Sequence, residues 1–327
     1  MNKEEAIKIQ EYINSSDKIY LFLHLSPDGD SLGSNVAFKS YLESLGKNVV
    51  LACHDLPPVQ LMNFLGLSPE YFLHEDPFNI NFSNEDLLIT LDSAASDRIS
   101  KNPEFKNKIL ECNVVNIDHH EVKENFAKFN VIHPDRASTT VLVHEYFNHI
   151  EHKRSLLEIN AIALGIFTDT GGFTNFNTTS YVFEIMRDLL DSGAEYEKLQ
   201  ISVNSKDELY FKTIAKIYSN IVILGEKNLA YTSFSLKDRL ELRLPVEFEI
   251  GELSNHLKGI QGNFDFVAAF TELEENYTKI SLRSVRSDFN VEEIAKKHGG
   301  GGHKAAAGAR LNENLENTIK IFLDSVK

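Results

Sequence analysis

Residues 24–34 read His-Leu-Ser-Pro-Asp-Gly-Asp-Ser-Leu-Gly-Ser, and they begin where the apolar run Lys18–Leu25 ends. The apolar run predicts a buried strand, and Ser34–Leu45 has the spacing of an amphipathic helix that Gly46 terminates. The polar residues between them are therefore predicted at the carboxyl end of a strand, in an α/β sheet layered with helices.

The same pattern of strand and helix repeats along the first half of the chain. Asn48–Ala52, Asp86–Leu91 and Asn113–Ile117 are nearly continuously apolar, as strands buried on both faces of a parallel sheet are. Ser138–Ile150 and Leu156–Phe167 have helical spacing. We expect an α/β fold class, with an N-terminal parallel-sheet domain and flanking helices.

The second half shows a different pattern, in which strands such as Lys279–Val285 alternate with short helices. This pattern predicts a separate, smaller C-terminal α+β domain. The charged helical segment before it suits a connection between two domains. We therefore expect domains at 1–190 and 221–327, joined by a helical linker at 191–220.

Residues that can bind metal follow the predicted strands or end a predicted helix. Because the carboxyl ends of parallel strands meet at one edge of a sheet, we expect these side chains to converge there. Carboxylates and imidazoles without thiolate favour Mn²⁺ or Mg²⁺, with Fe²⁺, Co²⁺ and catalytic Zn²⁺ left open. The set is too large for one ion and suits two ions that activate a hydroxide for phosphoryl displacement. Its members are His24, Asp28, Asp30, Asp92, Asp118, His119, His120 and Asp169.

Each of these residues also has a purely structural interpretation. His24 can be a core histidine, Asp28-Gly29-Asp30 a turn, and Asp92 or Asp169 a helix cap. The metal site is predicted from their joint placement at strand ends and not from any single residue.

A run of four glycines, Gly299–Gly302, precedes His303 and is predicted to open a helix at Lys304–Ala307. The backbone amides of such a loop can cradle a phosphate or carboxylate. Arg283, on a predicted strand, can clamp an anion by two parallel hydrogen bonds. The alternatives are a hinge or close backbone packing for the glycines, and a solvated strand face for Arg283.

Composition narrows the classes of partner. The chain has 33 basic and 48 acidic residues, a net charge of −15, so its surface as a whole repels a long nucleic acid. Between Lys279 and Arg310, however, seven basic residues accompany only three acidic ones, and this window can hold an anion. No apolar run approaches the ~20 residues that span a bilayer, and the polar start is unlike a secretory signal, so we expect a cytoplasmic location. Cys53 and Cys112 lie in apolar stretches and are expected to be buried free thiols.

Three motifs together resemble the DHH phosphoesterase family. They are the stretch His24–Ser34, the triplet Asp118-His119-His120 and the segment Thr168-Asp169-Thr170-Gly171. Gly300-Gly301-Gly302-His303, followed by Ala305–Gly308, resembles the signature of the subtype-1 DHH-associated domain. The resemblance covers nearly the whole chain. Its compact two-domain form is similar to the group of nanoRNases and 3′-phosphoadenosine 5′-phosphate (pAp) phosphatases.

The resemblance implies two sets of metal ligands that share one bridging aspartate. It also implies that His120 contacts the substrate phosphate. The implied sets are His24, Asp28 and Asp92 for one ion, and Asp30, Asp92, His119 and Asp169 for the other.

The second domain, by the same resemblance, binds the far end of the nucleotide with its glycine loop and a strand arginine. Arg136, downstream of the triplet, is a further candidate for steadying the phosphoryl oxygens, with a surface salt bridge as its alternative. The implied substrate contacts are Gly300, Gly301, Gly302, His303 and the strand residue Arg283, with Arg286 as a second candidate.

We expect a hydrolase that uses two divalent ions, Mn²⁺ first and Mg²⁺ or Co²⁺ as alternatives. Its substrates would be short oligoribonucleotides (nanoRNA), cleaved to 5′-mononucleotides, and pAp, cleaved to AMP and phosphate. The expected partners are short RNA or a small nucleotide, with no long nucleic acid and no membrane, and a homodimer is left open.

Two other functions fit the same sequence. A stand-alone phosphodiesterase for cyclic di-AMP or its linear product pApA would carry the same motifs. A non-catalytic nucleotide-binding protein is disfavoured, since no ligand of the set is missing. Among other relatives, a family-II inorganic pyrophosphatase would lack the glycine loop, and a RecJ-type exonuclease would be longer.

Overall fold

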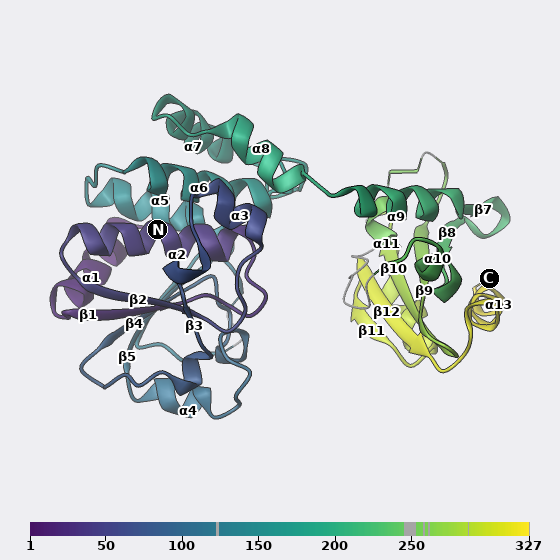
Figure 1. Ribbon diagram of the computed structural model, residues 1–327, viewed down its shortest axis with the longest axis horizontal. Coiled ribbons are helices and arrows are strands. Elements are labelled where there is room, and N and C mark those ends of the chain that lie inside the picture. Colours follow the sequence, from purple (N-terminus) through teal and green to yellow (C-terminus); the bar gives the residue numbers. More distant parts are fainter. Residues whose placement is uncertain (122–123, 245–252, 258, 261, 287, 327) are drawn as a thin grey trace. The chain divides into compact units, whose positions relative to one another are not determined.

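The computed structural model describes residues 1–121, 124–244, 253–257, 259–260, 262–286 and 288–326. The chain divides into two compact units, Met1–Ser205 and Lys206–Lys327. The segment 191–220 is shared between them, because helix α8 (Tyr196–Asn204) belongs to the first unit and helix α9 (Glu208–Ser219) to the second (Figure 1).

The first unit is built on a sheet of six parallel strands in the order β3-β2-β1-β4-β5-β6. The predicted parallel α/β sheet is therefore confirmed. The strands are β1 (Lys18–Phe22), β2 (Asn48–Cys53), β3 (Leu73–His74), β4 (Leu87–Leu91), β5 (Asn113–Asp118) and β6 (Phe129–Ile132).

The central strands are buried on both faces, which explains their continuous apolar sequence. In β1, Ile19 and Leu21 join the core on one face, while Tyr20 and Phe22 join a second core on the other. Helices α1, α2, α5 and α6 cover the first face, and α4 covers the second (Figure 1). Their bounds are α1 (Lys3–Asn14), α2 (Gly29–Ser44), α4 (Phe105–Leu110), α5 (Thr139–His149) and α6 (Leu156–Asp169).

The strand order reverses between β1 and β4, which pair at the centre of this sheet. In an open α/β sheet, a ligand site lies outside the carboxyl ends of the strands at such a reversal. His24 follows β1, Asp92 follows β4, and Asp118 ends β5. The topology therefore gathers these candidate ligands at one edge of the sheet.

Helix α2 begins five residues earlier than the predicted Ser34. The Asp28 side chain caps this helix by accepting hydrogen bonds from the backbone amides of Asp30 and Ser31, both at 3.0 Å. The segment Asp28-Gly29-Asp30, for which a simple turn was the structural alternative, thus forms the cap and first turn of a helix.

Helices α2 and α6 pack against each other at very short range. A Cβ atom on Gly33 would overlap the carbonyl oxygen of Ala161, and one on Gly165 would lie 2.5 Å from the Asp30 carboxylate. Because glycine occupies both positions, the first turn of α2 lies directly against the last turns of α6, which end at Asp169.

The second unit holds a mixed sheet of six strands in the order β11-β12-β10-β9-β8-β7. Strands β8 and β9 run parallel, and the other neighbouring pairs run antiparallel. This confirms the smaller C-terminal domain of strands and helices. The strands are β7 (Val222–Leu224), β8 (Leu229–Phe234), β9 (Phe266–Glu274), β10 (Tyr277–Ser284), β11 (Gly301–His303) and β12 (Ala306–Leu311).

The faces of this sheet carry different helices. Helices α12 and α13 pack on the face that includes Ile280 and Leu282. Helices α9 and α11 pack on the opposite face, beside Ala269 and Val267. The described helices of this unit, after α9, are α10 (Leu236–Glu241), α11 (Leu253–Leu257), α12 (Val291–Lys297) and α13 (Leu315–Ser325). The sequence pattern also predicts a helix at Gly251–Lys258, of which residues 251, 252 and 258 lie outside the described part.

The glycine run does not open a helix, so this prediction is wrong. Gly301–His303 form β11, and Ala306–Leu311 form β12, which pairs with both β11 and β10. The alanines favour a helix locally, but Ala307 and Ala309 are buried in the core of the sheet. Sheet pairing and burial therefore override helix propensity.

Close backbone packing, one of the alternatives for the glycine run, holds for Gly300. A Cβ atom there would overlap the carbonyl oxygen of Gly308. At Gly301, by contrast, a Cβ atom would meet nothing within 4 Å. The absence of a side chain at Gly301 thus leaves open space above the sheet.

The remaining helices of the first unit are short or peripheral. Cys53 and Cys112 are buried free thiols, as predicted. Among the described residues, no helix has both the length and the apolar character needed to cross a membrane. The remaining helices are α3 (Val59–Phe64) and α7 (Ser180–Asp191), and 3-10 turns lie at Pro69–Tyr71, Pro77–Asn79, Ser96–Arg98 and, in the second unit, Gly225–Lys227.

Candidate metal centre

Asp92 lies between two groups of candidate ligands. Its backbone has a left-handed conformation (φ 61°) that non-glycine residues rarely adopt. Such strain costs ~1–3 kcal/mol and is concentrated at functional positions. One oxygen of its buried carboxylate lies 3.5 Å from His24 Nε2, and the other lies 3.6 Å from His119 Nε2. Asp92 therefore contacts both groups with different oxygens.

The first group consists of His24, Asp28 and Asp92, each of which offers an atom within 4.8 Å of the others. His24 Nε2 lies 3.7 Å from the nearer Asp28 carboxylate oxygen. His24 is buried and follows β1, while Asp28 caps α2. The strand, the helix cap and the end of β4 thus bring these three residues together.

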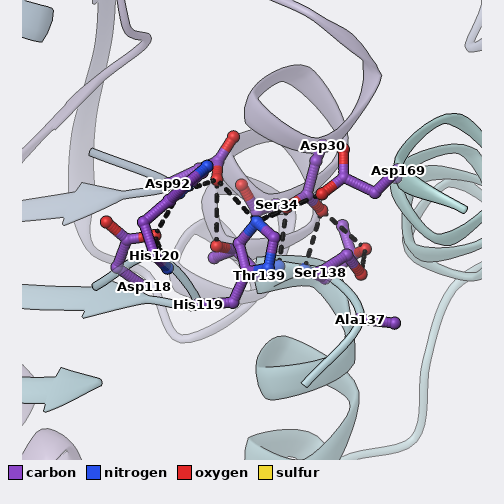
Figure 2. A network of polar contacts seen from close by, with 12 residues as sticks. Asp30, Ser34, Asp92, Asp118, His119, His120, Ala137, Ser138, Thr139 and Asp169 are labelled. Carbon is purple, nitrogen blue, oxygen red and sulfur yellow. Dashed lines mark hydrogen bonds and ion pairs between the residues drawn. The ribbon is translucent and has the colours of Figure 1, made fainter. Parts of the chain in front are cut away.

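The second group consists of Asp30, His119 and Asp169, again with atoms within 4.8 Å of one another. His119 Nε2 lies 3.1 Å from Asp169 and 3.9 Å from Asp30. Figure 2 shows the His119 ring between Asp92 on one side and Asp30 with Asp169 on the other. The end of α6 and the start of α2 supply the two carboxylates.

His24, which is buried, and His119, which is partly buried, are oriented in the same way. His24 Nδ1 lies 2.8 Å from the carbonyl oxygen of Leu25, and His119 Nδ1 lies 3.3 Å from that of Arg136. When Nδ1 donates to a carbonyl, Nε2 is the nitrogen available as a ligand. His119 Nε2 is buried, and although Asp169 lies 3.1 Å from it, no described residue meets it with hydrogen-bond geometry. This arrangement suits a metal ligand.

His120 lies beside the two groups, with its side chain about half exposed (52%). Asp118, which is buried, accepts hydrogen bonds from the His120 backbone amide (3.0 Å) and from Nδ1 (2.9 Å). The hydrogen bond between His120 Nδ1 and Asp118 is the main reason why the pKa of His120 is raised above its usual value. Nε2 is thus the His120 nitrogen left for a ligand.

Two threonines that the sequence analysis missed hold the Asp30 carboxylate. Asp30 accepts hydrogen bonds from the backbone amides of Thr139 (2.6 Å) and Thr140 (2.9 Å), and from the Thr140 hydroxyl (2.7 Å). The Thr139 hydroxyl donates to Asp92 (3.2 Å). Both threonines open α5, so the helix N-terminus faces a carboxylate. The N-cap Ser138 marks this helix start in the sequence, but nothing in the sequence shows that it faces Asp30.

Two asparagines that were also missed hold the end of α6. Asn175 Nδ2 and Asn177 Nδ2 both donate to the backbone carbonyl of Asp169, at 3.1 and 3.2 Å. They lie in the loop that follows the predicted Thr168–Gly171 segment. These two hydrogen bonds to its carbonyl therefore fix Asp169 in addition to the helix that it ends.

Burial and the excess of carboxylates in the cluster shift the pKa values of His24, His119 and Asp30. Burial lowers the pKa of His24, but hydrogen bonds to Asp28 and Asp92 outweigh it and raise that pKa to about 10. For His119, burial likewise lowers the pKa, and Asp169 and the neighbouring carboxylates raise it to about 10. Burial and the nearby carboxylates hold the pKa of Asp30 well above its usual value. Cations at this position would relieve the repulsion.

The donor set fits hard or borderline divalent ions. Carboxylate oxygens and imidazole nitrogens, without thiolate, are the ligands of Mn²⁺ and Mg²⁺ and of catalytic Zn²⁺. The structure thus contains a cluster of aspartates and histidines that could bind metal. It brings together all the predicted ligand residues, namely His24, Asp28, Asp30, Asp92, His119 and Asp169.

The guanidinium group of Arg136 is held by carboxylates. It donates to buried Glu145 (2.7 Å from Nε) and also pairs with Asp135. The salt-bridge alternative thus describes its side chain, while its carbonyl orients His119. Arg136 contacts the cluster through its backbone.

The remaining predicted contacts belong to the second unit. Arg283 is buried (8% exposed) in β10, where burial lowers its pKa, and it donates to the Leu282 carbonyl (2.9 Å). Arg286 pairs with Asp265 (3.1 Å) and Asp288 (2.7 Å). Gly300, Gly301, Gly302 and His303 lie in or just before β11.

Comparison with known proteins identifies the class of protein. Residues 18–166 match the model of the DHH family, N-terminal domain, and residues 247–327 match the DHHA1 domain. The chain belongs to the DHH family, and it is a phosphoester hydrolase. This confirms the resemblance seen in the sequence.

Individual relatives share most of the chain. The bifunctional oligoribonuclease and PAP phosphatase NrnA of Thermus thermophilus is 27% identical over 310 residues, 94% of this chain and 89% of that protein. The cyclic-di-AMP phosphodiesterase PdeA of Listeria monocytogenes is 26% identical over 319 residues, 93% of this chain but 46% of that protein. An exopolyphosphatase-related protein from Bacteroides fragilis has a similar structure, with a TM-score of 0.84 and 24% identity, covering 99% of this chain and 96% of that one. This last likeness shows the fold alone.

Proposed function

We propose that this chain hydrolyses short oligoribonucleotides to 5′-mononucleotides, and pAp to AMP and phosphate. The observation that carries the proposal is the convergence of two carboxylate and imidazole groups on opposite oxygens of Asp92. Each of the two substrates contains a phosphoester bond that water can cleave, so one site can act on both. The relative named for both activities matches the chain nearly from end to end.

The ligands fall into two sets, as the family resemblance implies. Two divalent ions, Mn²⁺ first and Mg²⁺ or Co²⁺ as alternatives, would be held by them. When bound, such ions supply a hydroxide nucleophile at neutral pH and offset charge on the phosphoryl oxygens. The sets are His24, Asp28 and Asp92, and Asp30, Asp92, His119 and Asp169.

His120 is placed to act on the substrate. Because Asp118 accepts from Nδ1 and raises the pKa of the ring, the protonated form of His120 is favoured more than that of a free imidazole. A cationic ring can donate from Nε2 to a phosphoryl oxygen and so stabilise the charge that develops in the transition state. Asp118 is therefore a positioning residue for His120.

Arg136 is assigned a positioning role as well. Its guanidinium is engaged by Glu145 and Asp135, while its carbonyl accepts from His119 Nδ1. It would keep the His119 ring oriented toward the carboxylates. A direct contact between Arg136 and substrate is the weaker alternative, because the phosphate would have to displace Glu145.

The second unit is assigned to bind the nucleotide portion of the substrate. The leading contacts lie on β10 and β11, the two strands that flank β12. They are Arg283 on β10 and, in or just before β11, Gly300, Gly301, Gly302 and His303. Arg286 is the weaker candidate, because two carboxylates already neutralise it.

A cyclic-di-AMP or pApA phosphodiesterase is the second candidate. The relative named for cyclic di-AMP is about twice as long as the part that matches, whereas the relative named for oligoribonucleotides and PAP matches over 89% of its length. This difference favours the first candidate. A non-catalytic nucleotide-binding protein is disfavoured, since every ligand of both sets is present.

Initial rates with Mn²⁺ separate these candidates. We expect turnover of pAp and of di- to pentaribonucleotides, with release of AMP or other 5′-mononucleotides, to exceed turnover of cyclic di-AMP. Fastest turnover of cyclic di-AMP would support the second candidate. An absence of turnover on all three, by a folded and Mn²⁺-loaded sample, would support a binding protein.

A further inference from the structure

A groove of about 490 Å³ lies along β10, β12 and the glycine run in the second unit. A volume of this size can hold a small ligand. Its walls include the backbone of residues 299–301 and the two basic side chains Lys279 and Arg310. These two cations are the first and last residues of the basic window between Lys279 and Arg310.

The strand register shows that this groove is part of a longer surface. Alternate residues of a strand share one face of a sheet. Ile280 and Leu282 of β10 are buried in the core on one face, so the residues between them lie on the other. The cross-strand pairs on that other face are Lys279 with Arg310, Ser281 with Gly308, and Arg283 with Ala306.

Strand β11 extends the same three rows. Gly301 pairs with Gly308, and His303 pairs with Ala306. The middle row is therefore made of small residues, while each end row carries basic or imidazole side chains. We call this surface the trough, and it consists of Lys279, Ser281, Arg283, Gly301, His303, Ala306, Gly308 and Arg310.

The two ends of the trough are separated by four residues along β10, which corresponds to about 13 Å. Arg283 and His303 occupy one end, and Lys279 and Arg310 occupy the other. Between them lie Ser281, Gly308 and Gly301, and a Cβ atom at Gly301 would meet nothing within 4 Å. A ligand must therefore be extended to contact both ends.

Lys279 and Arg310 form an electrostatically unfavourable pair. They lie directly opposite each other on neighbouring antiparallel strands, where like charges destabilise a sheet. On the other side of Lys279 lies neutral Thr271 of β9. Within the part of the chain that the structure describes, neither cation has a carboxylate partner. In a chain of net charge −15, two adjacent cations without a counter-ion point to an anionic ligand.

We propose that Lys279 and Arg310 form a second phosphate subsite, which binds the backbone of an oligonucleotide at a point about 13 Å from the Arg283 and His303 end. The proposal rests on the proposed function and defines its substrate class further. An oligonucleotide carries a phosphate at each linkage and can reach both ends. In pAp, a single ribose separates the two phosphates, so pAp reaches one end only. The subsite would therefore favour longer substrates over pAp.

The test compares two double variants of the Mn²⁺-loaded full chain. One is Lys279→Gln with Arg310→Gln. The control is Lys297→Gln with Lys320→Gln, which removes the same charge from helices α12 and α13 on the opposite face of the sheet. Steady-state rates are measured with pAp and with pentaadenylate, and equilibrium binding is measured with a hydrolysis-resistant phosphorothioate pentaadenylate.

For the subsite variant, we expect KM for pentaadenylate to rise on the order of tenfold, as for two partly exposed ionic contacts. We expect kcat and the KM for pAp to stay within about twofold. The salt dependence of pentamer binding should weaken by about 1.4 in the slope of log K against log salt, since single strands lose ~0.7 per phosphate contact. The melting temperature should not fall, because the variant removes a repulsion.

The proposal is overturned if pentamer binding is unchanged, if pAp and the pentamer are weakened equally, or if the control variant has the same effect. A lower melting temperature for the subsite variant alone would show that the two cations are structural. Should the wild-type protein hydrolyse neither substrate, the proposed function fails, but the phosphorothioate measurement still tests the subsite.

Discussion

Substitution of Gly165 by alanine adds a single Cβ atom next to one carboxylate of the candidate metal centre. The added Cβ would lie 2.5 Å from an Asp30 carboxylate oxygen and would overlap the Thr140 side chain. Thr140 donates two of the hydrogen bonds that hold Asp30, so both partners must move together. No other candidate ligand is among the nearest atoms.

The expected magnitudes differ for stability and for activity. Overpacking costs ~1–3 kcal/mol, while alanine in place of glycine in a helix returns up to ~1 kcal/mol. The free energy of unfolding should therefore fall by no more than about 2 kcal/mol. A carboxylate ligand displaced by on the order of 1 Å costs ~100-fold in rate. We thus expect kcat for pAp to fall about 100-fold in a protein that is still folded.

The assay pairs Mn²⁺-dependent pAp hydrolysis with urea unfolding followed by circular dichroism. Gly225→Ala is the control, since a Cβ there would meet nothing within 4 Å, and it should leave both quantities unchanged. Gly33→Ala is a second comparison, because its Cβ would overlap backbone and not a ligand. It should lower stability at least as much as Gly165→Ala. A rate within twofold of wild type for folded Gly165→Ala would refute the role of Asp30.

Four further predictions concern the same cluster. EDTA should abolish hydrolysis and Mn²⁺ should restore it, whereas Asp92→Ala should remain folded and inactive at any Mn²⁺ concentration; restored activity in that variant would contradict the bridging role. In the metal-free protein His24 and His119 have pKa values of about 10, above the usual 6.5, so both carry a proton at pH 7.5. Mn²⁺ binding should then release about one to two protons and become tighter as pH rises toward 10. Calorimetry in Tris and in HEPES measures the proton release, because the two buffers differ in their heat of protonation. Equal heats of binding in the two buffers would show that no proton is released and would argue against imidazole ligands. Because folding raises both pKa values from 6.5 to about 10, the stability that these imidazolium pairs give the metal-free protein is present below pH 6.5 and is lost as pH rises through about 10. Thr140→Val removes one hydrogen bond to Asp30 and should lower the free energy of unfolding by ~1–3 kcal/mol, which urea unfolding measures; an unchanged free energy would contradict this role of Thr140.

The elements that the sequence predicted well are those whose pattern follows directly from burial. Strands β1, β4 and β5 are apolar on both faces because helices cover both sides of the sheet. Strands β3 and β6 were missed, since β3 has two exposed residues and β6 buries only Val131. A short edge strand leaves little apolar signal in the sequence.

Errors arose where a distant part of the chain decides the local structure. The alanines after the glycine run form β12 because β10 and β11 pair with them, which local propensity does not reveal. The helical spacing predicts the start of α2 too late, because it begins at Ser34 and the polar residues from Asp28 onward, of which Asp28 caps the helix, carry no apolar signal. In this chain Asp28 caps the helix and also lies within reach of His24.

The candidate ligands could be collected from the sequence because each follows a strand or ends a helix. Their supporting residues could not, since Thr139 and Thr140 are more than 100 positions away from Asp30 in the chain. The shared role of Asp92 was implied only by the family resemblance. The structure adds that its two carboxylate oxygens lie near different histidines.

The most direct test of the central claim is an anomalous difference map from crystals of the full chain soaked in Mn²⁺. We predict two peaks about 3.5–4 Å apart. One should be bordered by His24 and Asp28, the other by Asp30, His119 and Asp169, with Asp92 between them. A map with no peak among these side chains, in crystals that bind Mn²⁺ elsewhere, would contradict the account.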